Sequence, residues 1–274
     1  MFSTILKNVK IKTPLVHCIT NYVTVNDCAN ILLACGGSPI MADDEDEVEE
    51  ITSICNALVI NIGTLNKRSI QSMMKAGIKA NEMNHPVILD PVGAGASDLR
   101  TSAAFELIDK IKFSVIRGNI SEIKTVAQGS GTTKGVDADI SDAITDANLD
   151  EAITYAKQLS AKTGAVIAIT GAIDIVANSS KAYVIRNGNA MMSKVTGTGC
   201  MLTAVIAAFC AANPAQLTEA VAAAVSAMGL CGELAYSRLL ENGGGTSTYR
   251  SYIIDEMSKM DETILERGMK IESR

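Results

Sequence analysis

A glycine- and threonine-rich turn that ends on a cysteine is the first place where this sequence could do chemistry. Residues 195–200 read VTGTGC and stand directly before the apolar run MLTAVIAAFC. Glycine and threonine begin helices well, and free cysteine packs as a small hydrophobe, so a plain helix cap explains the pattern. The turn could equally aim the backbone N–H groups of Gly197, Thr198 and Gly199 at an anion, because a helix N-terminus attracts negative charge. Taken alone, residues 195–200 leave both interpretations open.

Two acidic side chains elsewhere are candidates for holding a metal ion. Asp90 ends the apolar run PVILD, and the glycines that follow it let the backbone approach a ligand closely. Glu122 lies three residues after Asn119 at a predicted helix start, a spacing that is also typical of a capping pair. Mg²⁺ usually keeps several waters and takes only one or two carboxylates. We therefore predict that Asp90 and Glu122 hold Mg²⁺ through its waters.

Arg117 and the turn at residues 197–199 complete a candidate phosphoryl-transfer site. Arg117 supplies a fixed positive charge for nucleotide phosphates. The backbone N–H groups of the turn would stabilise charge that develops on the transferred phosphoryl group. The Walker pattern G-x-x-x-x-G-K-[ST] does not occur in the sequence, so this site is not a P-loop.

The elements that must position these residues alternate between short apolar runs and longer helical patterns. Strands are predicted at residues 14–20, 57–63, 86–92, 113–119 and 164–170. Helices are predicted at residues 25–37, 67–83 and 149–163. Such near-continuous apolar runs suit strands buried on both faces of a parallel sheet. Ligands of open sheets bind at the carboxyl ends of strands, which is where Asn21, Asp90, Arg117 and Thr170 fall.

The pattern changes after residue 170. The segments DIVAN (174–178) and KAYVIRNG (181–188) are separated by two serines, which predicts an antiparallel hairpin. Three helices are then predicted, the first over 198–212, the second from Pro214 to about Leu240 and the last after NGGGTS. We expect one α/β domain over residues 1–274, with a mostly parallel sheet, an antiparallel edge and helices on both faces.

Charge and hydropathy exclude several classes of partner. Thirty acidic residues against 24 basic residues give a formal net charge of −6, and no basic run is present, so we expect no nucleic-acid partner. The longest apolar stretches are shorter than a bilayer requires, and the N-terminal segment lacks a small-residue cleavage site. We therefore expect a cytoplasmic protein with no membrane partner. The acidic run at residues 43–50 is best explained as a solvated helix start.

Seven cysteines are spread along the chain without a C-x-x-C pair. They do not cluster with histidines, so we expect neither a disulfide framework nor a zinc site. His17 and His85 each lie at the edge of a predicted strand, where a lone histidine is usually a hydrogen-bonded structural residue. We assign neither histidine a catalytic role.

Six motifs in order along the chain carry a resemblance to a known family: HCITN, GGSPIM, ILDPVGAGAS, IRGNISEI, AITG and VTGTGCML. Together they resemble the hydroxyethylthiazole kinases, which belong to the ribokinase-like superfamily. The resemblance covers nearly the whole chain. It implies ATP-dependent phosphorylation of the primary alcohol of 4-methyl-5-(2-hydroxyethyl)thiazole, a thiamine salvage step. It also implies Mg²⁺ and a homotrimer with active sites at the subunit interfaces.

The resemblance assigns binding roles to five residues. Asn21 and Met41 match positions that form the thiazole pocket, and the backbone of Gly197 matches a position close to the substrate. Arg117 and Thr170 match positions that bind ATP.

Three further positions match those of the superfamily's chemistry. Asp90 and Glu122 fall on its acidic metal and phosphate positions, and Cys200 falls where related sugar kinases keep an aspartate as base. A weak base suffices where the alcohol loses its proton late in a loose transition state. Because a helix N-terminus lowers a thiol pKa, we expect Cys200 to be partly thiolate.

Other functions stay open on the sequence. A ribokinase-like dehydratase that repairs hydrated nicotinamide nucleotides is expected to keep an aspartate where Cys200 stands. A cysteine hydrolase would use Cys200 as nucleophile and need a base such as His17. A nucleotide-binding regulator would bind ATP and form no product.

Overall fold

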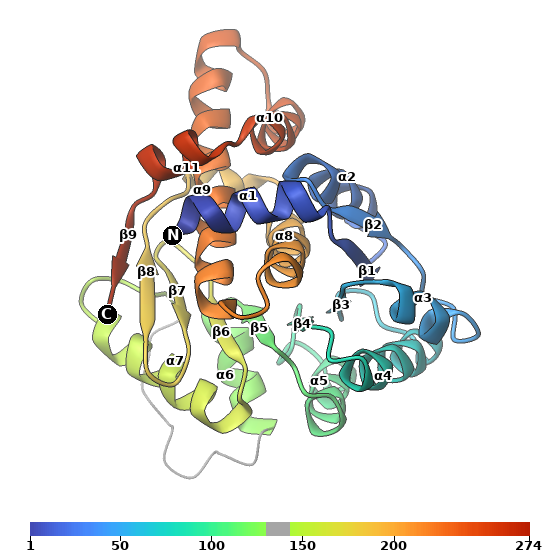
Figure 1. Ribbon diagram of the computed structural model, residues 1–274. Coiled ribbons are helices and arrows are strands. Elements are labelled where there is room, and N and C mark those ends of the chain that lie inside the picture. Colours follow the sequence, from blue (N-terminus) through green and yellow to red (C-terminus); the bar gives the residue numbers. More distant parts are fainter. Residues whose placement is uncertain (130–142) are drawn as a thin grey trace.

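The computed structural model describes residues 1–129 and 143–274, and within them it contains a nine-stranded sheet between two layers of helices (Figure 1). The strands are β1 (Leu15–Ile19), β2 (Ser38–Ile40), β3 (Ala57–Asn61), β4 (Val87–Asp90), β5 (Val115–Gly118), β6 (Val166–Ile169), β7 (Asp174–Ala177), β8 (Ala182–Ile185) and β9 (Ile271–Ser273). The helices are α1 (Phe2–Lys12), α2 (Val25–Cys35), α3 (Val48–Ile54), α4 (Lys67–Glu82), α5 (Asp98–Lys110), α6 (Ile120–Gly129), α7 (Leu149–Thr163), α8 (Thr198–Ala212), α9 (Leu217–Asn242), α10 (Thr246–Lys259) and α11 (Glu262–Gly268), with a short 3₁₀ helix at Ala190–Lys194.

The strand order in the sheet is β2-β1-β3-β4-β5-β6-β7-β8-β9. Neighbouring strands from β2 to β6 pair in parallel, and the pairs from β6 to β9 are antiparallel. This confirms the predicted mostly parallel sheet with an antiparallel edge. The register between β3 and β4 pairs Asn61 with Asp90, so the last residues of the two strands stand side by side.

Each face of the sheet carries its own hydrophobic core. In β3, Ala57 and Val59 pack into a core with α1, α2, α8 and α9, while Leu58 and Ile60 pack into a second core with α4 to α7. Successive residues of a strand point to opposite faces, so an all-apolar strand fills both cores. This arrangement confirms that helices cover both faces of the sheet.

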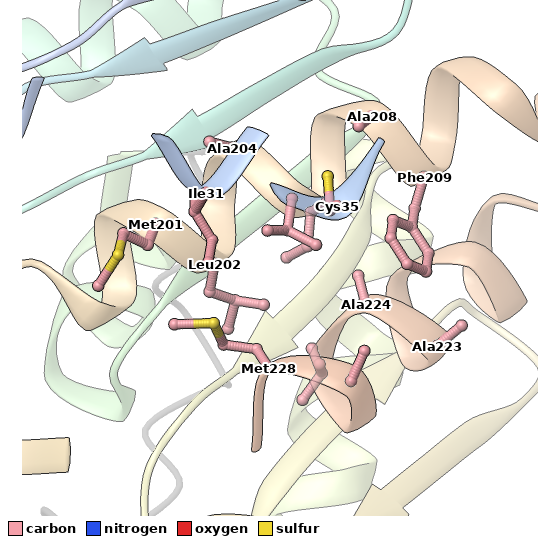
Figure 2. Packing of buried hydrophobic residues seen from close by; sticks show 14 of the residues in the cluster. Ile31, Cys35, Met201, Leu202, Ala204, Ala208, Phe209, Ala223, Ala224 and Met228 are labelled. Atoms are coloured by element: carbon pink, nitrogen blue, oxygen red, sulfur yellow. The ribbon is translucent and has the colours of Figure 1, made fainter. Parts of the chain in front are cut away.

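The central pair of helices on the first face is α8 and α9, which pack against each other (Figure 2). Phe209 of α8 lies on the side of Ala223 and Ala224 of α9, while Ala204 and Ala208 of α8 lie beside α2. Close packing of small and large side chains is typical of protein cores. The contact fixes the start of α8 relative to the sheet.

One helix differs from the sequence-based expectation about apolar stretches. By length and composition α9 is apolar enough to cross a membrane, but 78% of its apolar window is buried inside the fold. A helix that is apolar on most sides is also what a core position requires. The length of α9 therefore follows from its packing between the sheet, α8 and α10.

The ends of several elements differ from their predicted positions. The helix predicted to end at residue 37 ends at Cys35, because Gly36 adopts a left-handed conformation with φ of 95°. The acidic run at 43–50 mostly precedes its helix, since α3 begins at Val48, and Asp44 pairs with Arg68 of α4. The last two elements, α11 and β9, were not predicted.

Candidate active site

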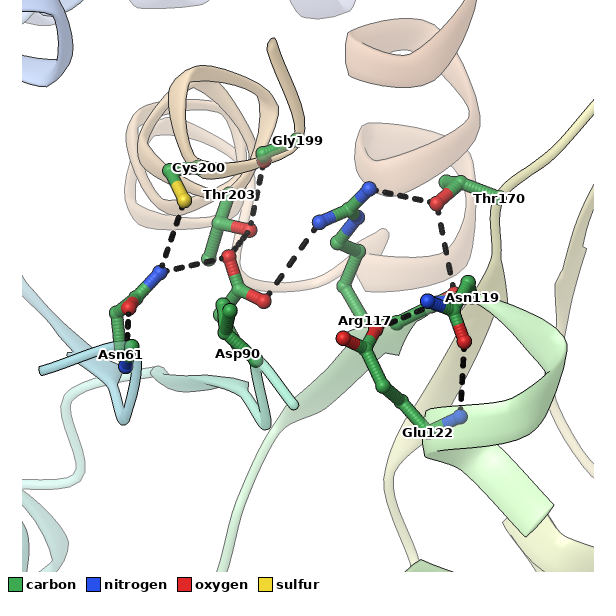
Figure 3. Close-up of polar contacts among 12 residues, drawn as sticks. Asn61, Asp90, Arg117, Asn119, Glu122, Thr170, Gly199, Cys200 and Thr203 are labelled. Atoms are coloured by element: carbon green, nitrogen blue, oxygen red, sulfur yellow. Dashed lines mark hydrogen bonds and ion pairs between the residues drawn. The ribbon is translucent and has the colours of Figure 1, made fainter. Parts of the chain in front are cut away.

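Polar side chains gather where the parallel strands end and α8 begins (Figure 3). Asn21 follows β1, Asn61 ends β3, Asp90 ends β4, Arg117 lies in β5 and Thr170 follows β6. The carboxyl ends of parallel strands share one edge of a sheet, which is why residues far apart in sequence meet here. The sequence predicted four of these five residues at strand ends, and Asn61 was missed.

The turn before α8 has the geometry of a tight helix start. Gly197 is the N-cap residue with φ of 89°, a left-handed conformation that favours glycine. A Cβ atom on Gly197 would also lie 2.4 Å from Cγ2 of Thr24. The first N–H groups of a helix have no partner within the helix, so those of Thr198 and Gly199 can bind an anion.

Arg117 packs directly against this helix start. A Cβ atom on Gly199 would lie 2.4 Å from Nη1 of Arg117. Nη2 of Arg117 donates a 2.6 Å hydrogen bond to Oγ1 of Thr170, and Nη1 lies 3.6 Å from Oδ1 of Asp90. The Arg117 side chain is only 12% exposed, so its positive charge is held in one place. The structure thus brings Arg117, Thr170, Gly199 and Asp90 together.

A pocket of about 720 Å³ opens beside Arg117 and the start of α8. Its polar lining includes Thr170, Asp174 and Asn187, and its apolar lining includes Leu202 and Met228. Burial raises the pKa of Asp174 to about 7, against the opposing effects of the Gly171 N–H hydrogen bond and of the Arg117 charge. A pocket with a cationic end, backbone amides and an apolar wall suits a nucleotide.

Asn187 in this pocket is held by the end of the chain. Its Nδ2 donates to the carbonyl oxygen of Gly268, and its Oδ1 accepts from the N–H of Lys270. Its Nδ2 also donates to Oε1 of Glu233 in α9. The segment that leads into β9 therefore supports one wall of the pocket.

Asp90 is fully buried. Its Oδ2 accepts hydrogen bonds from Nδ2 of Asn61 at 2.9 Å and from Oγ1 of Thr203 at 2.8 Å, while Oδ1 has no hydrogen-bond partner. Burial raises the pKa of Asp90, while Arg117 and the hydrogen bonds from Thr203 and Asn61 oppose that rise. The free oxygen faces the guanidinium of Arg117.

Glu122 has the geometry of a capping residue. Its Oε2 accepts from the N–H of Asn119 at 2.8 Å, and Oδ1 of Asn119 accepts from the N–H of Glu122 at 2.9 Å. Its Oε1 accepts from the N–H of Gly93 at 2.9 Å. The capping pair that the sequence left open is thus formed, and the carboxylate still lies close enough to Asp90 to raise its pKa.

The donor set of these two residues fits a hydrated Mg²⁺. Oδ1 of Asp90 is a buried oxygen without a hydrogen bond, and each Glu122 oxygen keeps a lone pair beyond its amide contact. Within residues 1–129 and 143–274, no three His, Cys, Asp or Glu side chains form a closed metal cluster. An ion that keeps its waters and binds phosphate needs fewer protein ligands than that.

Cys200 occupies the other side of the α8 start. Its Sγ accepts hydrogen bonds from Nδ2 of Asn21 and from Nδ2 of Asn61, both at 3.3 Å. The expectation of a lowered thiol pKa is wrong. Burial raises the pKa of Cys200, the negative charge of Asp90 raises it further, and the hydrogen bonds from Thr24, Asn61 and Asn21 only partly offset this. Near neutral pH the residue is a thiol.

Met41 and His17 belong to the β1–β2 edge of the sheet. Met41 follows β2 and packs, partly buried, against the α8 core. Both ring nitrogens of His17 are engaged, Nδ1 with Oγ1 of Thr52 and Nε2 with the carbonyl oxygen of Ala42, and burial lowers its pKa. His17 is therefore a structural residue, which counts against a Cys200–His17 hydrolase.

Several residues of the site were missed at the sequence level. Asn61 ends a predicted strand, so the strand-end rule that found Asp90 would have found it too. Thr203 lies one turn after Gly199 on α8, and its Oγ1 bonds Asp90. Asp174 opens the antiparallel hairpin, and its place in the pocket depends on how that hairpin packs.

Comparison with known proteins decides the family. The sequence model of the group described as "Hydroxyethylthiazole kinase family" matches residues 6–263. The chain belongs to the hydroxyethylthiazole kinase family. A hydroxyethylthiazole kinase of Clostridium acetobutylicum is 63% identical to it over 268 residues, which are 98% of each chain.

Solved structures agree with the family and with the fold. The structure of a hydroxyethylthiazole kinase from Pyrococcus horikoshii OT3 superposes with a TM-score of 0.88 at 33% identity, covering 100% of this chain and 98% of that one. A ribokinase-like superfamily protein from Enterococcus faecalis V583 gives a TM-score of 0.60 at 14% identity, covering 94% and 89%. The second likeness shows the shared ribokinase-like fold alone.

Proposed function

We propose that this chain transfers the γ-phosphoryl group of ATP to the primary alcohol of 4-methyl-5-(2-hydroxyethyl)thiazole, a step of thiamine salvage. The observation that carries the proposal is the start of α8, which lies between two different environments. On one side Arg117 and Thr170 border a nucleotide-sized pocket, and on the other side Asn21 contacts Cys200. An alcohol bound beside Cys200 and a phosphate bound beside Arg117 would meet at the N–H groups of the helix start.

The nucleotide would bind with its phosphates toward Arg117 and its base toward the apolar wall near Leu202 and Met228. Arg117 and Thr170 are the ATP-binding residues of this proposal. The N–H groups of Gly197, Thr198 and Gly199 would stabilise the charge that develops on the transferred group. The alcohol oxygen bonds to the γ-phosphorus as the bond to ADP breaks, and the alcohol proton leaves late.

Magnesium would be held by Asp90 and Glu122 through its waters, and it would neutralise the charge of the phosphates when bound. Asp90 also fixes Arg117, whose Nη1 lies 3.6 Å away. The carboxylate therefore has two tasks, one toward the ion and one toward the guanidinium.

The thiazole would occupy a pocket formed by Asn21, Met41 and the backbone of Gly197, with its hydroxyl beside Cys200. A thiol with a raised pKa orients this hydroxyl near neutral pH, and its thiolate accepts the proton at higher pH. Tyr22 and Val23 next to Asn21 are 79% and 59% exposed, which supports a subunit interface over this pocket. We accordingly propose a homotrimer of single-domain, cytoplasmic subunits without nucleic-acid or membrane partners.

The direct test incubates the purified protein with ATP, Mg²⁺ and the thiazole alcohol, and follows thiazole phosphate and ADP by chromatography and mass spectrometry. Formation of both products in equal amounts is the expected result. Hydrated nicotinamide nucleotide, offered in a parallel reaction, should be left unchanged. ATP binding without any product, or turnover of the hydrated nucleotide alone, would reject the kinase proposal.

A further inference from the structure

Asn61 is a polar side chain of the site whose hydrogen-bonding capacity is fully used. Its Oδ1 accepts hydrogen bonds from the N–H of Gly63 at 2.9 Å and from Nδ2 of Asn21 at 3.0 Å. Its Nδ2 donates to Oδ2 of Asp90 at 2.9 Å and to Sγ of Cys200 at 3.3 Å. Asn61 is 1% exposed, so none of these bonds competes with bulk water. Both lone pairs and both hydrogens of the amide are therefore used.

The orientation of this amide is determined by its neighbours. The backbone N–H of Gly63 can only donate, so it requires the Asn61 oxygen on its side. On the opposite side Oδ2 of Asp90 accepts hydrogen bonds from Asn61 and from Oγ1 of Thr203, so it requires the Asn61 nitrogen there. A flipped amide would place a donor against a donor and an acceptor against an acceptor.

We propose that Asn61 is a positioning residue for phosphoryl transfer, which holds the Cys200 thiol and the Asp90 carboxylate at fixed places on either side of the α8 start. This inference rests on the proposed function for the identity of the reaction. Asn61 does not touch the alcohol in this arrangement. It acts through Cys200, through Asp90 and through Asn21.

The chemistry of the neighbours explains why a neutral amide suits this place. The titratable groups around Cys200 are Asp90 of β4 and Cys28 of α2, with Arg117 of β5 beyond Asp90. Without a donor between them, a thiolate and a carboxylate at close range repel each other. The two N–H groups of the Asn61 amide donate to Oδ2 of Asp90 and to Sγ of Cys200 at the same time. The carboxylate and the sulfur can therefore lie close together without sharing a proton between them.

The test compares two buried asparagines at opposite ends of α8. Asn61→Ala removes the amide of the site, and Asn213→Ala removes an equally buried amide whose Nδ2 bonds the carbonyl oxygens of Ile5 and Phe209. Because alanine at position 61 can impair folding, Asn61→Asp is the second variant. It is isosteric and keeps an oxygen for Gly63 and Asn21, but loses the donors toward Asp90 and Cys200.

Two measurements separate positioning from general stability. In Asn61→Ala, kcat should fall about 10- to 100-fold while KM for ATP stays within about twofold. The pH midpoint of Cys200 alkylation by iodoacetamide, followed by mass spectrometry on the full chain, should rise by about one pH unit because a donor to the thiolate is lost. Asn61→Asp should change both quantities in the same direction, and Asn213→Ala should change neither.

An unchanged alkylation midpoint in both Asn61 variants would overturn the proposal, as would an equal loss of kcat in Asn213→Ala. If the wild-type protein forms no thiazole phosphate, the proposed function fails. The alkylation midpoint still tests the link between Asn61 and Cys200 in that case, since it needs no substrate. A raised midpoint then supports the link, and an unchanged midpoint rejects it.

Discussion

Cys200 is subject to opposing influences. Two amide donors and the helix start favour its thiolate, whereas burial and the charge of Asp90 favour its thiol, and the net effect is a raised pKa. A base that is mostly protonated near neutral pH gains its active form as the pH rises toward its pKa. The reaction tolerates this, because the alcohol proton need not leave before the phosphoryl group has largely transferred.

The pH dependence of turnover tests the role of this thiol. If thiolate is the base, kcat should rise between pH 7 and about 9, approaching tenfold per pH unit, since the thiolate fraction grows in that proportion below the pKa. Cys200→Ala should lower kcat by about 10–10⁴-fold and remove the rise, and Cys200→Asp should stay active. Steady-state kinetics across this range measure all three. If kcat of the wild-type protein does not change with pH, Cys200 only positions the alcohol and does not act as the base.

The sequence predicted several of the residues that form the site, but it did not predict the pKa of Cys200. Asp90, Arg117 and Thr170 were predicted because they end apolar runs, and the structure brings them together. The raised pKa of Cys200 could not be predicted, because it depends on burial and on Asp90, which lies 110 positions earlier in the chain. Helix-start position alone gave the wrong sign.

At the scale of elements, the anion site proposed at the start of α8 depends on strand β5, which places Arg117 against Gly199. Gly199 leaves the space that the guanidinium fills, since its missing Cβ would lie 2.4 Å from Nη1. Helix backbone is suitable for alanine at this position, so the requirement for glycine comes from the neighbouring strand. The VTGTGC motif thus needs glycine for two reasons: Gly197 adopts a left-handed conformation, and Gly199 leaves space for the Arg117 side chain.

Gly199→Ala is therefore expected to weaken nucleotide binding. The added methyl group pushes Arg117 away from Thr170 and Asp90, so KM for ATP should rise about tenfold or more, with little loss of thermal stability. Gly245→Ala is the matched control, because Gly245 precedes α10 and a Cβ there meets no atom within 4 Å. Calorimetric titration with ATP measures the effect. Equal ATP affinity in the two variants would contradict this account of Gly199.

Element prediction succeeded where periodicity was strong. The helix predicted at 149–163 coincides with α7, and the five predicted buried strands all occur with shorter ends. Pro214 was expected to open a helix, but α9 begins at Leu217, because residues 213–216 form a turn closed by a hydrogen bond from the N–H of Gln216 to the carbonyl oxygen of Asn213. Strand β9 covers three residues and is defined by its partner β8, which no local pattern reveals.

At the scale of the whole molecule, the proposed trimer would bury an exposed surface next to the proposed thiazole pocket. Tyr22 is 79% exposed beside the buried Asn21. We expect light scattering to give the mass of three chains. Tyr22→Arg should shift the mass toward one chain and lower thiazole phosphorylation, because a charge would be buried at the interface. Ile11→Arg is the control, because Ile11 is an exposed residue of α1 away from this pocket. A trimer that persists in Tyr22→Arg would place the interface elsewhere.

The overall architecture was predictable because alternating strands and helices allow few arrangements. The mostly parallel sheet, its antiparallel edge and the layers of helices on both faces are all confirmed. Composition was less reliable for α9, whose membrane-like hydropathy reflects burial between other elements. The apolar content of a helix does not distinguish a helix that lies in a membrane from one buried in a protein core.

The position of β9 has a consequence for biosynthesis. Asn187 at the pocket wall is held by Gly268 and Lys270, and β9 adds to the sheet beside β8 (Figure 1). A nascent chain whose residues 268–273 are still inside the ribosome has every other strand of the sheet available, but lacks the support for this wall. In such a chain Asn187 keeps only Glu233 of its three partners, so we expect it to bind ATP less tightly than the full chain.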